Sequence, residues 1–210
     1  MDFKPGDFFI GVIEFIGALV PGAVLLFLEN DMLPSWVANS LPSDSFQKGA
    51  AVLIGSYVLG HFLLGYGVHL NRAVNLLFPV SRDTIYKAVA ARIAPLGNAD
   101  RCPTAEEARR DAFYHACAVV RLESPAATSE IERNMADYKL FRSLTLLFAI
   151  DSITRLFLFI RGQSDWHRPL AMGVLFGLAG WRFCFLLNWT YRITFEHFAL
   201  ITDEKKPSDG

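Results

Sequence analysis

Ionisable side chains inside long apolar stretches are the residues of this 210-residue sequence whose types and spacing could do chemistry. Burying charge in lipid is costly, so each such residue is a functional hypothesis by default. Because Asp151 and Arg155 are four residues apart, they share one helix face and can pair within their own helix. The complete set consists of Glu14, His61, Asp151, Arg155 and Arg182.

Two pairs between helices also follow from the depth of these residues in their apolar stretches. His61 and Asp151 fall near the middle of theirs, whereas Glu14 and Arg182 fall near the same end. The depths predict that Glu14 can meet Arg182 and that His61 can meet Asp151. Structural pairing is the interpretation that we favour, ahead of an ion or proton pathway, with catalysis third.

Four apolar stretches must position these residues, and each has about 21 residues, which suffices to cross a hydrocarbon core of ~30 Å. Charged residues fall almost entirely between them. We therefore expect an all-α, polytopic membrane protein with four transmembrane helices, the first of them retained rather than cleaved as a signal peptide. The predicted spans are Phe8–Leu28, Ala50–Leu70, Leu140–Ile160 and Leu170–Trp189.

Lysine and arginine counts predict the orientation of the four spans. The first connection carries only Lys48 and the third only Arg161 and Arg168, whereas the second, Asn71–Lys139, carries ten. The positive-inside rule places the second connection in the cytoplasm, together with both termini. The predicted division is spans one and two in 1–70, a cytoplasmic helical segment in 71–139, spans three and four in 140–190, and a cytoplasmic tail in 191–210.

The cytoplasmic segment carries helix signals of its own. Ser81 begins a helix of about twelve residues, and a capping box at Thr104 begins a second that runs to about Leu122. Pro125 follows Ser124 and begins a third, which nothing interrupts before Ile160. We expect the second and third helices to form a hairpin between spans two and three, with the pair Arg109 and Arg110 available to dock a partner.

Small residues indicate where helices approach one another. Gly173, Gly177 and Gly180 form a stripe on the fourth span, opposite Arg182 on a helical wheel, and Ser56 and Gly60 form a similar stripe on the second. A fourth span with two faces that avoid lipid favours a homo-oligomer. Within the first span, Pro21 and Gly22 predict a bend or a hinge.

Several functional classes find little support. The sequence has no metalloprotease, nucleophile-elbow, P-loop or dinucleotide-binding motif, so we assign no catalytic, cofactor-binding or metal-binding residue. Arg192 and His197 match the spacing of HEPN ribonucleases, a match that chance also supplies. A net charge of −1 does not indicate nucleic acid as a partner. The three cysteines, widely spaced and without C-x-x-C, indicate neither disulfides nor zinc.

Three patches carry a family resemblance: Asp7-Phe-Phe with Leu19–Ala23, Tyr57–His61, and Glu132–Leu144. Together they resemble a loose group of small bacterial membrane proteins, some similar to the membrane effectors of antiviral defence systems. The resemblance implies a bacterial inner membrane and a pore-forming or membrane-perturbing effector, and carries over no catalytic residue. Three hypotheses follow: an oligomeric, channel-like effector with a cytoplasmic sensing segment, a membrane scaffold that recruits a soluble partner, and an intramembrane enzyme.

Overall fold

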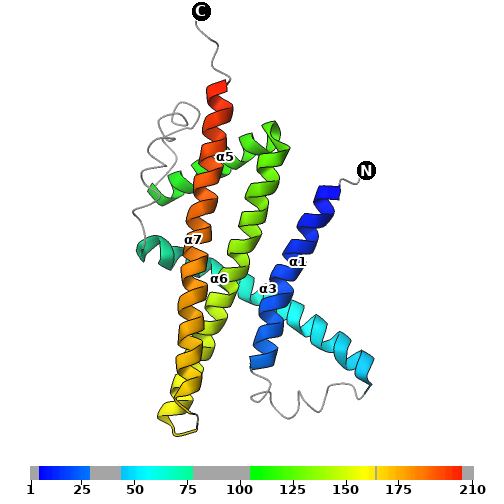
Figure 1. Cartoon of the computed structure of the whole chain (residues 1–210), viewed down its shortest axis with the longest axis vertical. Coiled ribbons are helices and arrows are strands. Elements are labelled where there is room, and N and C mark those ends of the chain that lie inside the picture. Colours follow the sequence, from blue (N-terminus) through cyan, green and yellow to red (C-terminus); the bar gives the residue numbers. More distant parts are fainter. Residues whose placement is uncertain (1–4, 29–43, 78–104, 164, 205–210) are drawn as a thin grey trace, which may run out of the picture. The chain divides into compact units, whose positions relative to one another are not determined.

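The computed structural model describes residues 5–28, 44–163 without 78–104, and 165–204, with side chains for 15–28, 44–70, 111–163 and 165–203. All of the regular structure in these residues is helical, and no strand occurs among them. The five helices are α1 (Pro5–Leu28), α3 (Ser45–Leu77), α5 (Ala105–Glu123), α6 (Pro125–Ile160) and α7 (His167–Glu204) (Figure 1).

Three of the described helices are long and apolar enough to cross a membrane, in α3, α6 and α7. In α1 the part with described side chains, Phe15–Leu28, is a shorter apolar helix. A helix therefore exists at each of the four predicted spans. Three of these helices have the length and apolar composition of a membrane span. Thr128, Ser143, Thr145 and Thr154 of α6 donate their hydroxyls to carbonyls four residues earlier, which satisfies these groups without water.

Local signals explain where α6 begins and ends. The Ser124 hydroxyl accepts a hydrogen bond from the Ala127 amide at 3.4 Å. Pro125 takes the first helical position, where a backbone N–H would have no partner within the helix, so its missing N–H costs nothing. At the other end, Gly162 has φ +71°, and the amides of Gly162 and Gln163 donate to Phe159 and Leu158. This is a Schellman ending, which needs a residue without Cβ. The predicted uninterrupted helix from Pro125 to Ile160 is confirmed.

The chain divides into two compact units. The membrane unit comprises residues 1–74 and 136–184, and the head unit comprises residues 75–135 and 185–210. The boundary between the two falls inside α6 and α7 and near the end of α3, because each of these helices contributes residues to both units.

The membrane unit has polar groups inside and apolar groups outside. Buried positions include Ser56, Arg142, Ser143, Thr145, Asp151 and Arg155, whereas exposed positions include large apolar residues of all its helices, such as Phe27, Phe62, Ile153 and Leu178. A lipid-facing surface accounts for this distribution, since hydrocarbon removes the penalty of exposing such side chains.

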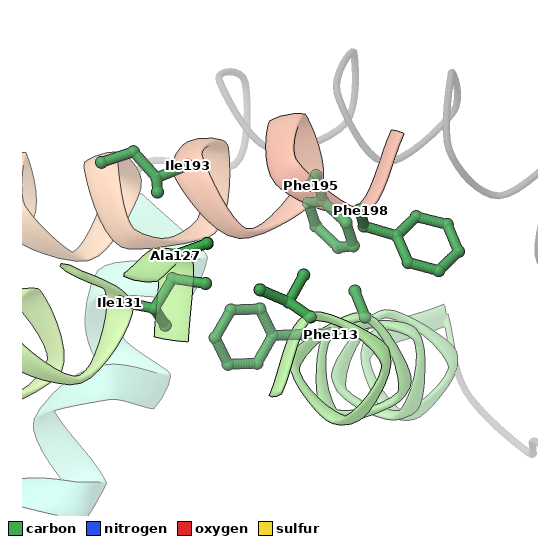
Figure 2. Packing of buried hydrophobic residues seen from close by; sticks show 8 residues of the cluster. Phe113, Ala127, Ile131, Ile193, Phe195 and Phe198 are labelled. Atoms are coloured by element: carbon green, nitrogen blue, oxygen red, sulfur yellow. The ribbon is translucent and has the colours of Figure 1, made fainter. Parts of the chain in front are cut away.

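The head unit has an ordinary hydrophobic core. Phe113, Ala116 and Val120 of α5 pack with Ala127 and Ile131 of α6 and with Ile193, Phe195 and Phe198 of α7. Figure 2 shows these side chains reaching one shared interior from three helices. The segment predicted as a tail from residue 191 is thus helical through Glu204, and it is one of the three segments that form the core of the head. The predicted helix at Ser81 lies outside the described residues.

Helix α1 crosses α3 at very short range. A Cβ on Gly22 would overlap the Ser56 carbonyl, and a Cβ on Gly60 would overlap the Ala18 carbonyl. The pairs Ala18 with Gly22 and Ser56 with Gly60 are each small residues four apart, the pattern that lets membrane helices approach backbone to backbone. We call these four residues the crossing. Ser56 and Gly60, which the sequence predicted as a packing stripe, lie at this crossing, and Pro21 lies buried beside it.

Gly60→Ala should destabilise the membrane unit by about 1–3 kcal/mol, because the new methyl group forces the two backbones apart. Gly65→Ala on the same helix is the matched control, since its Cβ would meet nothing within 4 Å. Thermal unfolding in detergent measures both. Equal stability of the two variants would contradict the crossing.

Candidate functional site

The buried charges of the membrane unit form the candidate site, and those whose side chains the structure describes all lie on α6. Asp151 and Arg155 are 1% and 7% exposed, and Arg155 Nε donates to Asp151 Oδ1 at 3.2 Å. The pair predicted from the four-residue spacing is therefore formed within one helix. Each group offsets part of the other's cost of leaving water.

Arg155 also reaches a second helix. Its Nη2 donates to the backbone carbonyl of Leu28, the last residue of α1, at 2.7 Å. This bond joins α6 to α1 and gives the charged guanidinium an acceptor within the protein. Asp151 keeps Oδ2 buried without a hydrogen-bond partner among the described residues.

A second buried arginine, Arg142, connects α6 to α3. Its Nη2 donates to the Leu64 carbonyl at 3.0 Å, and its Nε is buried without a partner in the described structure. Gly67 makes room for it, because a Cβ there would lie 2.8 Å from Arg142 Nε. Arg142 was not among the predicted site residues, although it lies inside the predicted third span. Its nearness to the end of that span gave it the pattern of an interfacial arginine.

The predicted partner of Asp151, His61, lies elsewhere. His61 is exposed and packs edge-on against the Tyr57 ring, with centroids 4.5 Å apart. It makes no ion pair with Asp151, whose bonded oxygen is taken by Arg155. The predicted pair of His61 and Asp151 is therefore not formed, because the four-residue spacing within α6 supplies a nearer cation. Glu14 lies in α1, but its side chain and its predicted contact with Arg182 lie outside the described residues.

Arg182 points its guanidinium toward α6, 5.9 Å from the centroid of the Phe141 ring. Two glycines of the predicted stripe also approach α6: a Cβ on Gly173 would lie 3.8 Å from Ser152 Oγ, and one on Gly180 would lie 3.5 Å from Thr145 Cγ2. A Cβ on Gly177 would meet nothing within 4 Å. Both faces of α7 therefore find contacts on α6, so Arg182 does not by itself require a neighbouring subunit.

The remaining predicted residues separate into two groups. Pro21 and Gly22 lie inside α1 at the crossing, where α1 continues as a helix through Pro21. Arg109 and Arg110 lie in α5, but their side chains are outside the described residues. Among the described residues no group of three or more His, Cys, Asp or Glu could hold a metal ion.

The head unit carries polar contacts at its surface. Arg121 of α5 pairs with Glu132 of α6 at 3.0 Å, and His197 Nε2 lies 3.4 Å from Glu130 Oε2. Arg192, the arginine of the ribonuclease-like spacing, pairs with Glu196 at 2.7 Å on the exposed side of α7. His197 and Arg192 are thus each paired with a different glutamate.

Comparisons with known proteins add no relative: no family model matches the chain, and neither a curated protein nor a solved structure is similar enough to count as a match. Function is therefore argued from the geometry above.

The contact between Arg142 and Gly67 should appear as coupling in a double-mutant cycle. Arg142→Gln alone should lower the free energy of unfolding by about 1–2 kcal/mol, because the hydrogen bond to the Leu64 carbonyl is lost. Gly67→Ala should cost more in the wild-type background than beside Arg142→Gln, because its methyl group collides with the arginine side chain. Thermal unfolding of the four proteins measures the coupling, and strictly additive losses would contradict the contact.

Burial raises the pKa of the Cys117 thiol in the head, an effect that a side-chain hydrogen bond with Thr194 only partly opposes. Since the thiolate is the reactive form, maleimide should modify Cys117 at least about tenfold more slowly at pH 8 than a cysteine made by Leu122→Cys. Leu122 lies on the same helix and is 84% exposed.

The rate at Cys117 should rise with pH, and its increase should continue to a higher pH than at position 122. Because the folded-state pKa is the raised one, the head should also lose stability as pH climbs through it. Mass spectrometry of the labelled peptides separates the sites, and equal rates would contradict the packing of the head.

Proposed function

We propose that α1, α3, α6 and α7 all cross the membrane and that the head unit lies in the cytoplasm. The apolar outer surface of the membrane unit supports embedding, and α1 with its 24 residues is long enough to cross beside the other three. The ten lysines and arginines between the second and third predicted spans support a cytoplasmic head and cytoplasmic termini. In this arrangement α5 and the start of α6 form the cytoplasmic hairpin.

We further propose that the chain is an oligomeric, channel-like membrane effector whose head senses a partner or ligand. The observation that supports this function is the shared use of α6 and α7, with 36 and 38 residues, by both units. A helix is stiff along its axis because each residue is bonded to the next turn. A change in the head core around Val120 and Phe198 would therefore act on the same helices that carry Asp151 and Arg182.

The resemblance to small bacterial membrane proteins supports the bacterial inner membrane as the location and antiviral defence as the setting. Both remain part of the proposal. The arginine pair Arg109 and Arg110 on α5 is the place where we propose that a soluble partner binds.

A membrane scaffold is the second candidate, and one observation favours it. Asp151, Arg155 and Arg142 have their bonds inside the subunit, which is the arrangement expected of charges that fix helices in place. In that case neutralising them changes folding and nothing else. An intramembrane enzyme would need His61 beside Asp151, which the structure does not provide.

Ion flux into liposomes that contain the purified protein separates the two candidates. The channel-like function predicts flux for the wild type, measured with and without an applied potential, and a change of at least about tenfold in Asp151→Asn or Arg182→Gln. Arg161→Gln is the control, because Arg161 is exposed in the turn after α6 and lies over the Phe157 ring.

Absence of flux in the wild type under every condition would overturn the channel-like function. If the charge variants lost folded protein in proportion to flux, the scaffold would be the better description. Size-exclusion chromatography of each variant before reconstitution supplies the folded fraction needed for that comparison.

A further inference from the structure

Helix α1 is attached to its unit over a small part of its described surface. Within Phe15–Leu28 the buried positions are Ala18, Pro21 and Gly22, all within about one turn. Phe15, Ile16 and Val20 are exposed and Phe27 is 82% exposed, whereas the other large side chains of this range are half-buried. Within Phe15–Leu28, full burial is therefore confined to about one turn.

The first attachment is the crossing with α3. Ala18 and Gly22 on α1 meet Ser56 and Gly60 on α3 backbone to backbone. One turn before Ala18, the Phe15 ring packs on the Tyr57 ring of α3, with centroids 5.1 Å apart. These contacts keep this part of α1 on α3. Ser56 Oγ, buried here, has no hydrogen-bond partner among the described residues.

The second attachment is the bond from Arg155 of α6 to the Leu28 carbonyl, six residues beyond Gly22. This hydrogen bond is directional and is stronger than a neutral one, since its donor is charged. Asp151 orients the guanidinium by taking Nε, which leaves Nη2 directed at α1. Asp151 therefore acts on α1 only through Arg155.

We propose that α1 is a movable element of the membrane unit, with the crossing as its pivot and Arg155 as a latch that Asp151 positions. When the latch opens, the end of α1 at Leu28 moves away from α6 while Ala18 and Gly22 stay on α3. The proposal does not rest on ion conduction, because it concerns two attachments seen within one unit. It applies to a channel-like protein and to a scaffold alike.

Cross-linking between α1 and α3 tests the latch. Leu26 lies between the pivot and the latch, and a Cβ on Gly55 would lie 3.8 Å from its Cδ1. We would combine Leu26→Cys with Gly55→Cys in the full-length protein in lipid nanodiscs and measure the initial rate of disulfide formation with a mild oxidant. Mass spectrometry identifies the peptide pair, so the native cysteines do not interfere.

Arg155→Gln should slow this cross-link about three- to tenfold, the range set by the loss of one such hydrogen bond inside a membrane protein. Asp151→Asn should slow it less, and Arg155→Lys should keep most of the wild-type rate, because lysine can still donate to the carbonyl. Arg161→Gln, one turn and a half further along, is the control and should leave the rate unchanged.

An unchanged rate in both Arg155→Gln and Asp151→Asn would overturn the latch. So would failure of all three latch variants to fold, since it would make Arg155 a fixed part of the unit rather than a releasable contact. A slower rate that Arg155→Lys restores supports the latch whatever the liposome flux experiment shows, which keeps the two proposals separately testable.

Discussion

A guanidinium inside an apolar unit has to find its hydrogen-bond acceptors within the protein, and this constraint joins α6 to two other helices of the membrane unit. Arg155 and Arg142 of α6 each donate to a main-chain carbonyl of another helix, Leu28 of α1 and Leu64 of α3. In water these bonds would compete with solvent and add little. In hydrocarbon an unmet donor would be costly, so α6 becomes the helix on which the other two are assembled.

The head unit obeys a different constraint. Its core consists of aromatic and aliphatic side chains from α5, α6 and α7, and its charges lie at the surface in pairs such as Arg121 with Glu132. This is the distribution expected of a protein in water. Along α6 the buried residues therefore change from apolar ones in the head, Ala127 and Ile131, to a largely polar set after Met135. Helix α7 does not follow this pattern, because it buries Ala179 and Phe183 in the membrane unit and Thr190 and Thr194 in the head.

The sequence alone predicts the helices well, because apolar stretches, the Ser124 cap and Pro125 are local signals. It also predicts the bond between Asp151 and Arg155, since a four-residue spacing fixes their neighbourhood. The acceptors of the arginines could not be predicted, because a backbone carbonyl such as that of Leu28 has no signature in the sequence. The pair of His61 and Asp151 was predicted from their similar depths in the spans, and depth does not determine which way a side chain points.

Chain order adds a consequence to the bond between Arg155 and Leu28, whose partners are separated by 127 residues. At ~5–20 residues per second, the ribosome needs about 6–25 s after completing α1 before the arginine that receives it has been made. During that interval the Leu28 carbonyl is without this donor. The contact that joins α1 to α6 can therefore form only after most of the chain has been synthesised.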